Sequence, residues 1–351
     1  PTINYALDKG AKVILMSHLG RPKGKVDETA RLTPVAERLS QLLGKAVKKS
    51  DDSIGPSVKS QSNSLKEGEI LVLENVRFYK EETENDPEFS KNLASLGDIF
   101  VNDAFGSSHR AHASVVGVAD YLPAVSGFLL MKEIEYFDKI LKNPEHPFYA
   151  ILGGAKVSDK IEVIKNLLNI ADNILIGGGM AYTFLKAQGV KIGSSKLEEE
   201  KIDLAGELMD LALKKGKKIV LPCDHIVTDK IEDGAKTEAV GLDIPDGKIA
   251  VDIGIKTVEL FKQELKDART VVWNGPLGIF EIEAFSQGTR EIASFLASVD
   301  AVKVVGGGDT AACIEKMNMV DKFSHISTGG GASLEYLEGK VLPGIAALKE
   351  K

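Results

Sequence analysis

The sequence is short of several features that mark specialised classes of protein. It has only two cysteines, Cys223 and Cys313, which form neither a CxxC pair nor a cluster with histidine that could hold zinc. No apolar run is long enough to span a bilayer, and no N-terminal stretch resembles a secretory signal. We therefore expect no disulfide scaffold, no zinc site and no membrane contact, and we expect a reducing, cytoplasmic compartment.

An excess of positive charge is also missing. Lys and Arg number 44 against 51 Asp and Glu, so the net charge is −7. This balance argues against a nucleic-acid partner or an anionic membrane held by bulk charge. A content of 43% hydrophobic and 27% charged residues is that of a globular chain, and a length of 351 residues suggests about two domains. Any anionic small ligand must therefore meet a local cluster of cations.

Two common nucleotide-binding motifs are absent as well. The chain contains no GxxxxGK[ST] sequence, and no GxGxxG opens a βαβ unit. The first absence excludes a P-loop enzyme, and the second disfavours a Rossmann dehydrogenase.

Strands that alternate with helices dominate what is present. Apolar runs predict strands at 11–16, 69–73, 98–102, 148–152, 173–176, 218–222, 270–273 and 302–305. Apolar residues at helical spacing predict helices at 2–9, 33–43, 128–141, 159–168, 198–215, 255–265 and 286–296. Thr33 is the expected N-cap of the second helix, and Gly44 closes it. The pattern predicts an α/β fold of two Rossmann-like, three-layer domains, each a mostly parallel sheet with helices on both faces. The break at 143–147, after a helix that joins the domains, places their boundary.

Each predicted strand of the first half ends in a loop with basic side chains. Because the carboxyl ends of parallel strands share one edge of a sheet, Arg21, Arg77 and Arg110 are expected to converge. Three histidines, His18, His109 and His112, lie in the same loops. Arginine forks suit carboxylate and phosphate oxygens, so the set favours an anionic ligand, although each side chain taken alone could be a solvated surface residue.

Residues 150–160, AILGGAKVSDK, join a buried strand to a helix near the middle of the chain. The glycine pair lets the backbone approach a ligand, and Lys156 and Lys160 are expected on one face of the helix start. Cations are unfavourable there unless an anion faces them. A solvated turn with two surface lysines is the alternative interpretation.

Three glycine triplets, at 177–179, 306–308 and 329–331, follow strands and precede helices. Free amides at such helix starts can cradle phosphates. Asp309 and Thr310 open the helix after the second triplet, either as caps or as groups that face magnesium and a nucleotide. Glu281 lies where it could accept hydrogen bonds from a ribose. A basic site on one domain and a glycine-rich site on the other suggest phosphoryl transfer.

Seven ordered blocks closely resemble the signature sequences of the phosphoglycerate kinase family. They are SHLGRPK at 17–23, ENVRF at 74–78, NDAFGSSHRAH at 102–112, LGGAKVSDK at 152–160, VWNGPLGIFE at 272–281, VGGGDT at 305–310 and STGGGASLE at 327–335. The resemblance runs along the whole chain. It implies a glycolytic kinase that transfers the acyl phosphate of 1,3-bisphosphoglycerate to ADP, reversibly and with Mg²⁺, giving 3-phosphoglycerate and ATP.

The resemblance also implies roles for individual residues. It gives a phosphoglycerate site of His18, Leu19, Gly20, Arg21, Arg77, His109 and Arg110. It gives catalytic roles to Lys156, Gly307 and Gly330, and it makes Asp309 the residue associated with the metal. It gives a nucleotide site of Gly153, Lys160, Gly177, Gly178, Ala250, Asn274, Glu281, Gly306, Gly307, Gly308, Asp309 and Thr310.

The domains implied are 1–142 with a returning segment 340–351, for phosphoglycerate, and 148–339, for the nucleotide. They would close about a hinge in a monomer whose partners are these small molecules.

The chain departs from the family pattern at two places. Ala250 stands where the family usually has glycine near the adenine, so we expect a slightly reshaped pocket. The family's opening strand, its Asp-Phe-Asn motif and an arginine do not precede Pro1, so we expect that the source protein has residues before it. A chain that begins at Pro1 is expected to bind nucleotide without turnover. A non-catalytic binder of anions remains the alternative from another class.

Overall fold

The structure is a computed structural model that describes residues 1–348. It divides into two compact units. The first unit holds Pro1–Lys132 and the C-terminal segment from Val341, and the second unit holds Glu133–Lys340. The division falls inside helix α6 (Phe128–Lys142), before the segment 143–147 where the sequence suggested it. The reason is that the Glu133 carboxylate accepts hydrogen bonds from Thr328 and contacts the His325 ring, both in the second unit.

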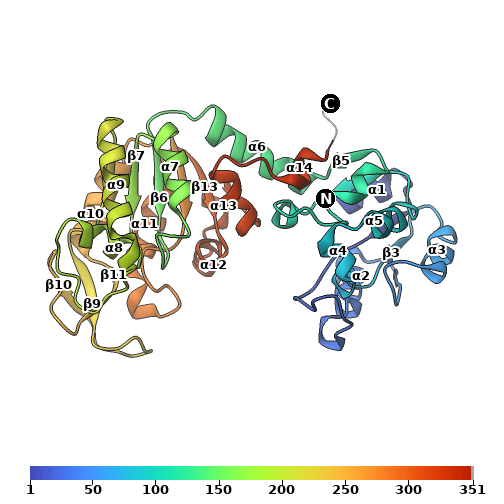
Figure 1. The fold of residues 1–351 in the computed structure, drawn as a ribbon, viewed down its shortest axis with the longest axis horizontal. Helices are drawn as coiled ribbons and strands as arrows, with labels where there is room; N and C mark the ends of the chain where they lie inside the picture. The colour runs from blue at the N-terminus through green and yellow to red at the C-terminus, as the bar shows by residue number, and fades with distance from the viewer. Residues whose placement is uncertain (349–351) are drawn as a thin grey trace. The chain divides into compact units, whose positions relative to one another are not determined.

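A six-stranded parallel sheet forms the centre of the second unit (Figure 1). In spatial order its strands are β14 (His325–Ile326), β13 (Val302–Gly306), β12 (Thr270–Asn274), β6 (Phe148–Leu152), β7 (Asn173–Ile176) and β8 (Lys218–Val220). Every neighbouring pair is parallel. All the carboxyl ends therefore lie at one edge of this sheet, where the lysine loop and the glycine triplets leave it.

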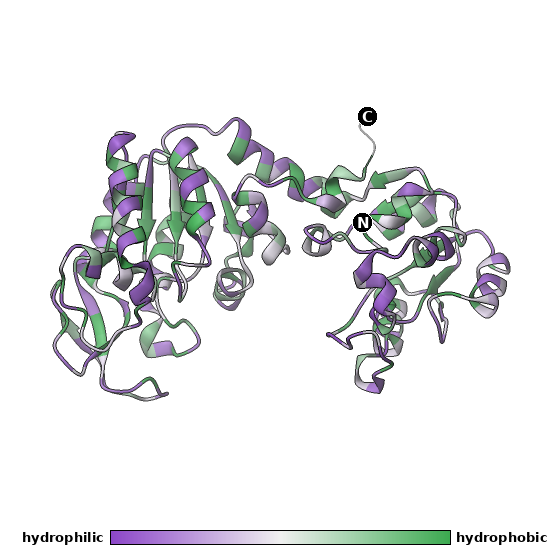
Figure 2. Cartoon of the chain, viewed as in Figure 1, coloured by the Kyte–Doolittle hydropathy of each residue, from purple (hydrophilic) through white to green (hydrophobic). Residues whose placement is uncertain are grey.

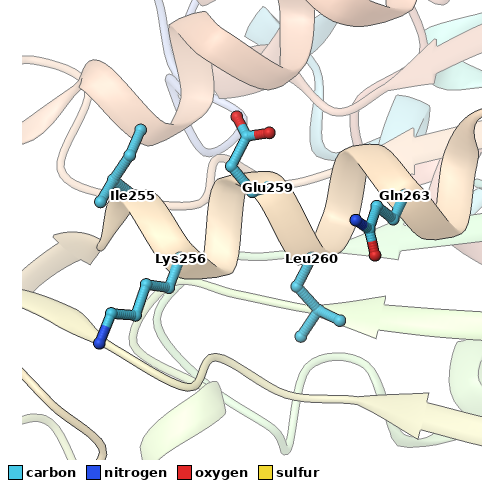
Figure 3. A pocket seen from close by; sticks show the side chains of 5 residues that line it. All are labelled: Ile255, Lys256, Glu259, Leu260 and Gln263. Carbon is cyan, nitrogen blue, oxygen red and sulfur yellow. The ribbon is translucent and has the colours of Figure 1, made fainter.

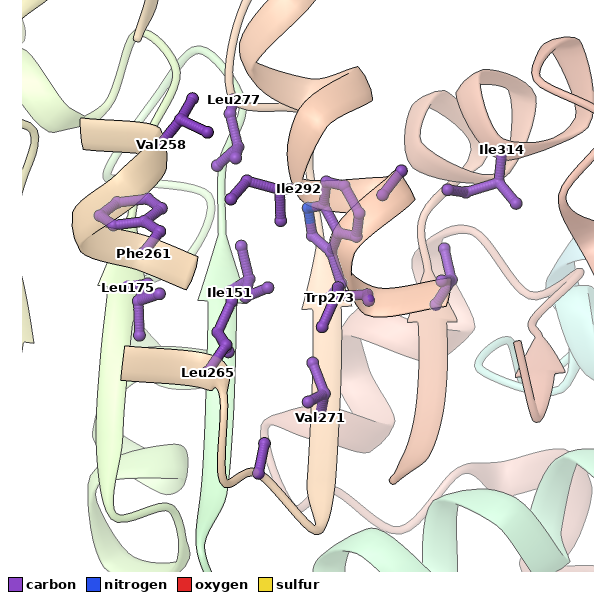
Figure 4. Packing of buried hydrophobic residues seen from close by; sticks show 14 of the residues in the cluster. Ile151, Leu175, Val258, Phe261, Leu265, Val271, Trp273, Leu277, Ile292 and Ile314 are labelled. Carbon is purple, nitrogen blue, oxygen red and sulfur yellow. The ribbon is translucent and has the colours of Figure 1, made fainter. Parts of the chain in front are cut away.

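Helices cover both faces of this sheet. On one face lie α10 (Ile255–Leu265), α11 (Gln287–Ser298) and α12 (Gly308–Lys316), whose apolar side chains pack on Ile151, Leu175 and Trp273 (Figure 4). On the other lie α7 (Ile161–Ile170), α9 (Ile202–Lys214) and α13 (Gly331–Leu337), with α8 (Ala181–Ala187) against α9 (Figure 1). Each fully buried large side chain contributes about 1.5–3 kcal/mol, and the apolar residues of the strands mark this core (Figure 2).

The second unit also contains a small antiparallel sheet, which was not predicted from the sequence. Its strands, in the order β10-β9-β11, are β10 (Glu238–Val240), β9 (His225–Thr228) and β11 (Ile249–Ile253). They lie among charged and glycine-containing turns, so no long apolar run marks them.

Two small parallel sheets form the first unit, where the sequence suggested a single open sheet. One has the order β1 (Val13–Leu15), β3 (Ile70–Val72) and β2 (Val47–Lys49), and the other pairs β4 (Phe100–Asn102) with β5 (Ala124–Ser126). The expectation that β4 belongs with β1 and β3 is therefore wrong, because its hydrogen-bond partner is β5. The helices are α1 (Thr2–Asp8), α2 (Thr33–Leu43), α3 (Pro56–Asn63), α4 (Lys80–Glu84), α5 (Pro87–Ala94) and α14 (Pro343–Ala346).

One predicted helix cap is also wrong. Thr33 is the first residue of α2, and Leu32 takes the N-cap position without a side-chain bond. The Leu32 carbonyl accepts the Ala36 amide at 3.0 Å, while its own amide donates to Glu74 at 2.9 Å. Gly44 closes α2 in the left-handed conformation (φ 62°), as predicted.

The helices described between residues 1 and 348 include none that is long and apolar enough to cross a bilayer.

Candidate active site

Hydrogen bonds hold the first two basic loops of the first unit together. The loop after β1 carries His18 and Arg21, and the loop after β3 carries Arg77 within the 3-10 helix η2 (Val76–Phe78). The Arg77 guanidinium donates to the Gly20 carbonyl at 3.2 Å. The Gly24 amide donates to the Arg77 carbonyl at 3.2 Å. The two loops that carry His18, Arg21 and Arg77 are therefore linked to each other by hydrogen bonds.

The third basic loop follows β4 and is fixed by the C-terminal segment. The Asn102 side chain donates to the Ser108 hydroxyl at 3.1 Å and to the Gly344 carbonyl at 3.0 Å. The Gly344 amide donates back to the Ser108 carbonyl at 2.8 Å. These bonds hold the backbone directly before His109 and Arg110.

The three loops bring their cations close together. Burial, followed by the charges of Arg77 and Arg110, lowers the pKa of His18 to about 4, and the same three causes lower the pKa of His112 to about 4. Burial lowers the pKa of Arg77, and the charges of Arg110 and Arg21 lower it further. Across residues 1–348, no ion pair within 4.0 Å is recorded for these three arginines. Such a cluster attracts an anion.

A buried acid lies beside this cluster. The Glu82 carboxylate is 2% exposed and accepts hydrogen bonds from the Ser114 amide (2.9 Å) and hydroxyl (2.6 Å). Its nearest histidine nitrogen, Nδ1 of His112, is 3.7 Å away. Burial raises the pKa of Glu82. Glu82 therefore offsets only part of the positive charge, and its oxygens are turned toward Ser114.

In the second unit the loops that leave β6, β7 and β12 are tied together by backbone bonds. The Gly153 amide donates to the Asn274 carbonyl (3.0 Å), and the Gly154 amide donates to the Pro276 carbonyl (3.2 Å). The Gly178 amide donates to the Leu277 carbonyl at 3.0 Å. A Cβ on Gly153 would overlap the carbonyl oxygens of the β12 loop, so glycine is required there.

Lys156 and Lys160 lie in different surroundings, although the sequence suggested one helix face. Helix α7 begins at Ile161, so both lysines precede it, and Lys156 is exposed while Lys160 is 8% exposed. The turn between them is held by Glu198, whose carboxylate accepts the amides of Val157 (2.5 Å) and Ser158 (3.1 Å). The shared-face prediction is therefore wrong, because Glu198 stabilises a turn where the helix was expected.

Lys160 lies against the end of β12. Its ammonium donates to the side-chain oxygen of Asn274. Burial lowers the pKa of Lys160 to about 8, while the charges of Asp159 and Asp309 act in the opposite direction. The side-chain nitrogen of Asn274 is buried and has no hydrogen-bond partner in the structure. A buried cation and an unused donor at the same strand end suit a phosphate oxygen.

The second glycine triplet lies beside this pair. Gly306 ends β13, Gly307 is the N-cap of α12 with φ of 88°, and a Cβ on Gly308 would meet open space. No side chain caps α12, so its first amides are available to a ligand. The Thr310 hydroxyl, in contrast, is fully buried and accepts the Gly275 amide at 2.7 Å. A role for Thr310 in binding would therefore fall to its backbone.

Three further predicted residues, Gly330, Glu281 and Ala250, lie in other segments of the second unit. Gly330 is the N-cap of α13, with φ of 50°, and it follows β14. Glu281 is exposed in the loop after β12. Ala250 lies in β11, where its amide donates to the Ser195 hydroxyl (3.0 Å) and its side chain packs near Tyr182 of α8. Ala250 thus belongs to an apolar cluster that includes Tyr182 and Leu185 of α8, the helix that follows the first glycine triplet.

Asp309 is the candidate for holding a metal. Its carboxylate is exposed in the first turn of α12. Among the described residues 1–348 no group of three His, Cys, Asp or Glu could hold a metal by itself. Mg²⁺ is often bound through one or two carboxylates and the phosphates of a substrate, so a single carboxylate beside amides that can hold those phosphates fits that ion.

A shallow depression on α10 is separate from these groups. Ile255, Lys256, Glu259, Leu260 and Gln263 line it, and all five belong to this one helix (Figure 3). No predicted site residue contributes to it, and we assign it no role.

Some residues that shape the site were given no role from the sequence. Asn75 and Glu74 connect the basic loops, and Glu198 holds the Lys156 turn. The first two lie inside the ENVRF block, which was a signal available in advance. Glu198 is distant in sequence from Lys156, and nothing in its surroundings marked it.

The comparisons with known proteins agree on one family. The family model described as phosphoglycerate kinase matches residues 1–340. A phosphoglycerate kinase of Dictyoglomus turgidum is 59% identical over 353 aligned positions, which cover 100% of this chain and 89% of that protein. The enzyme of the same name from Moorella thermoacetica is 58% identical, with 100% and 90% covered.

Solved structures give the same result. Phosphoglycerate kinase from Coxiella burnetii is 44% identical, with a TM-score of 0.90 over 99% of this chain and 88% of that one. The enzyme from Pyrococcus horikoshii is 34% identical, with a TM-score of 0.87 over 99% and 89%. The predicted two-unit α/β fold is thereby confirmed.

Proposed function

Since the chain belongs to the phosphoglycerate kinase family, we propose that it transfers a phosphoryl group between 1,3-bisphosphoglycerate and ADP with the residues described above. The observation that carries the assignment of residues is the cluster of Arg21, Arg77 and Arg110, which form no ion pair within 4.0 Å with an acid among the described residues 1–348. A phosphoglycerate carries a carboxylate and a phosphate, and arginine forks bind both.

The chemistry needs positioning more than proton transfer. In the direction of ATP synthesis, a β-phosphate oxygen of ADP attacks the acyl phosphorus, and the bond from that phosphorus to the carboxyl oxygen breaks. The leaving carboxylate is stable as an anion at pH 7, so no general acid or base is required. In the reverse direction the carboxylate of 3-phosphoglycerate is the nucleophile.

The second unit supplies the nucleotide side of this proposal. The amides of Gly306–Gly308 and the buried Lys160 would hold the phosphates, and Glu281 would accept from the ribose. The exposed ammonium of Lys156 would follow the moving phosphoryl group. Bound Mg²⁺, held by Asp309 and the nucleotide phosphates, would neutralise phosphate charge.

We further propose a cytoplasmic monomer. Its first unit would hold the phosphoglycerate and its second unit the nucleotide, and the two would close about a hinge during turnover. The cluster of cations lies in the first unit and the glycine amides lie in the second, which supports this division.

An assay of 3-phosphoglycerate phosphorylation by ATP tests the proposal. The purified full-length protein should form ADP only when both 3-phosphoglycerate and Mg²⁺ are present, and Asp309→Asn should raise the Mg²⁺ concentration needed for half-maximal rate. Turnover that is independent of 3-phosphoglycerate would contradict the substrate, and an unchanged Mg²⁺ requirement in Asp309→Asn would contradict the metal assignment.

A further inference from the structure

Two polar residues are fully enclosed at the turn between β3 and η2. Asn75 is 0% exposed and Glu74 is 2% exposed. Buried polar groups are costly unless every donor and acceptor is paired, and an apolar pair would be cheaper if packing were their only task. The hydrogen-bond partners of Asn75 and Glu74 therefore indicate which segments this turn holds together.

Asn75 bridges three segments of the first unit. Its side-chain nitrogen donates to the Leu19 carbonyl and to the Ala30 carbonyl, both at 2.8 Å. Its side-chain oxygen accepts the Arg77 amide at 3.0 Å. Both donor hydrogens and the oxygen are thus in use. One side chain connects the loop after β1, the 3-10 helix η1 (Glu28–Ala30) that precedes α2, and the backbone of Arg77.

Glu74 holds Asn75 in turn. One carboxylate oxygen accepts the amides of Asn75 and Leu32, each at 2.9 Å. The other accepts from Arg31 (3.0 Å) and Lys49 (2.9 Å). Burial acts to raise the pKa of Glu74, but these hydrogen bonds outweigh it and hold the pKa at about 2. The carboxylate therefore stays charged, and it holds the backbone amide of Asn75 in place.

The loops that Asn75 connects carry like charges, and its bonds add to those that Arg77 makes with Gly20 and Gly24. Arg77 lies among like charges: burial lowers its pKa most, and the charges of Arg110 and then Arg21 lower it further, while Glu82 acts in the opposite direction. Repulsion between like charges that face a shared ligand is strongest when that ligand is absent. A bridge of neutral hydrogen bonds keeps the cations close without neutralising them, which an acidic bridge could not do.

We propose that Asn75, held by Glu74, is a positioning residue that fixes the His18–Arg21 loop against Arg77. In this way it sets the affinity of the site for a three-carbon carboxylic acid that carries a phosphate group. This inference rests on the proposed function, in which that loop pair binds 3-phosphoglycerate. Asn75 does not itself contact the ligand and acts through the backbone that it holds.

Calorimetry on Asn75→Ala tests the role. We expect 3-phosphoglycerate to bind about tenfold more weakly, since the three side-chain hydrogen bonds that organise its site are lost, while ADP affinity is unchanged. The matched control is Asp86→Ala in the same unit, which removes the cap of α5, a 2.8 Å bond to the Phe89 amide. The control should lower thermal stability and leave both affinities unchanged.

The possible outcomes distinguish a failure of the positioning role of Asn75 from a failure of the proposed function. If the unmodified protein binds 3-phosphoglycerate and Asn75→Ala binds it equally well, the inference is overturned alone. If the unmodified protein does not bind 3-phosphoglycerate at all, the proposed function fails and the inference fails with it. Equal losses for Asn75→Ala and Asp86→Ala would show a general effect of stability and would overturn the positioning role.

A second variant covers the case in which Asn75→Ala does not fold. Glu74→Gln keeps the shape and the acceptor for both amides but removes the charge that faces Arg31 and Lys49. We expect about threefold weaker 3-phosphoglycerate binding, with ADP binding unchanged. Unchanged binding of 3-phosphoglycerate by this folded variant would overturn the proposal.

Discussion

Lys160 illustrates how one residue's surroundings set its chemistry. The ammonium is buried at the end of β12, where it donates to Asn274, and its pKa of about 8 lies well below the ordinary value of 10.5. Exposed Lys156, four residues earlier, has no such burial. The two lysines of one motif therefore lie in different surroundings.

ADP affinity should fall as the pH rises from 7 to 9. Lys160 loses its proton as the pH passes about 8 and then no longer attracts phosphate. Calorimetry across this range measures the effect, with Lys160→Met as the comparison. The variant should bind ADP more weakly at pH 7 and show a flatter pH dependence. A decline of equal slope in both proteins would contradict the role of Lys160.

Arg110→Ala should weaken 3-phosphoglycerate binding by one to two orders of magnitude, roughly the worth of a charge-assisted hydrogen-bond pair, and should leave ADP binding nearly unchanged. Arg110 lies in the first unit with the other cations, whereas the glycine amides lie in the second. Calorimetry with each ligand separately measures both. Equal losses for the two ligands would show that the assignment of ligands to units is mistaken.

At the scale of elements, the loops at the carboxyl ends of β6, β7 and β12 are joined by backbone hydrogen bonds. Gly153, Gly154 and Gly178 are bonded to the loop after β12, and the space around Gly153 is filled by carbonyl oxygens. The spacing of these loops is set by backbone contacts that no side chain could replace.

Gly153→Ala should therefore lower both stability and nucleotide affinity. The added methyl overlaps the β12 loop, and relief of that overlap must move the Lys156 turn, at a cost of roughly 1–3 kcal/mol. Gly206→Ala is the control, because Gly206 lies within α9 with open space around it and should stabilise that helix by up to about 1 kcal/mol. Thermal unfolding and ADP calorimetry read out both variants, and an unaffected Gly153→Ala would contradict the close packing of these loops.

The sequence predicted those helices and strands whose apolar residues recur at helical spacing or form a continuous run. The range 255–265 was predicted correctly as α10 because one apolar face packs on the sheet. The strands β9, β10 and β11 were missed, since their pairing is antiparallel and distant turns hold them. The cap of α2 was assigned to Thr33, but the N-cap is Leu32, whose amide donates a long-range hydrogen bond to the Glu74 carboxylate.

The candidate site was predicted only in part for a related reason. Arg21, Arg77 and Arg110 could be grouped because strand ends in one unit tend to meet. The residues that support them could not be grouped in this way, because Asn75 and Glu198 reach partners 40 to 56 residues away in the chain. The periodicity of nearby residues does not indicate contacts between segments so far apart in the chain. The burial of Lys160 was hidden as well, since it depends on Asn274, which lies 114 residues away.

At the scale of the whole molecule, buried histidines make stability depend on pH. Burial lowers the pKa of His225 to about 4, although the charge of Asp224 acts in the opposite direction, and its ring is fully enclosed beside Tyr182. The unfolded chain binds this proton below about pH 6.5 and the folded chain only below about pH 4. Stability therefore falls as the pH drops through this window.

His225→Phe should reduce that acid sensitivity. The contribution of His225 is on the order of 3 kcal/mol when the pH has fallen to 4, because the pKa difference spans about 2.5 units. Denaturant unfolding at pH 7 and pH 4.5 measures it, and the variant should lose less stability between the two than the unmodified protein. Parallel losses in both would show that His225 is not titrating in this range.

The measurement that tests the account most directly is the turnover of Lys156→Ala with both ligands characterised. The exposed ammonium of Lys156 is proposed to act on the phosphoryl group in transit, so its removal should lower kcat by about 10²–10³-fold. The affinities for 3-phosphoglycerate and ADP, measured by calorimetry, should remain within a few fold of those of the unmodified protein. Unaltered kcat in Lys156→Ala would contradict the central claim.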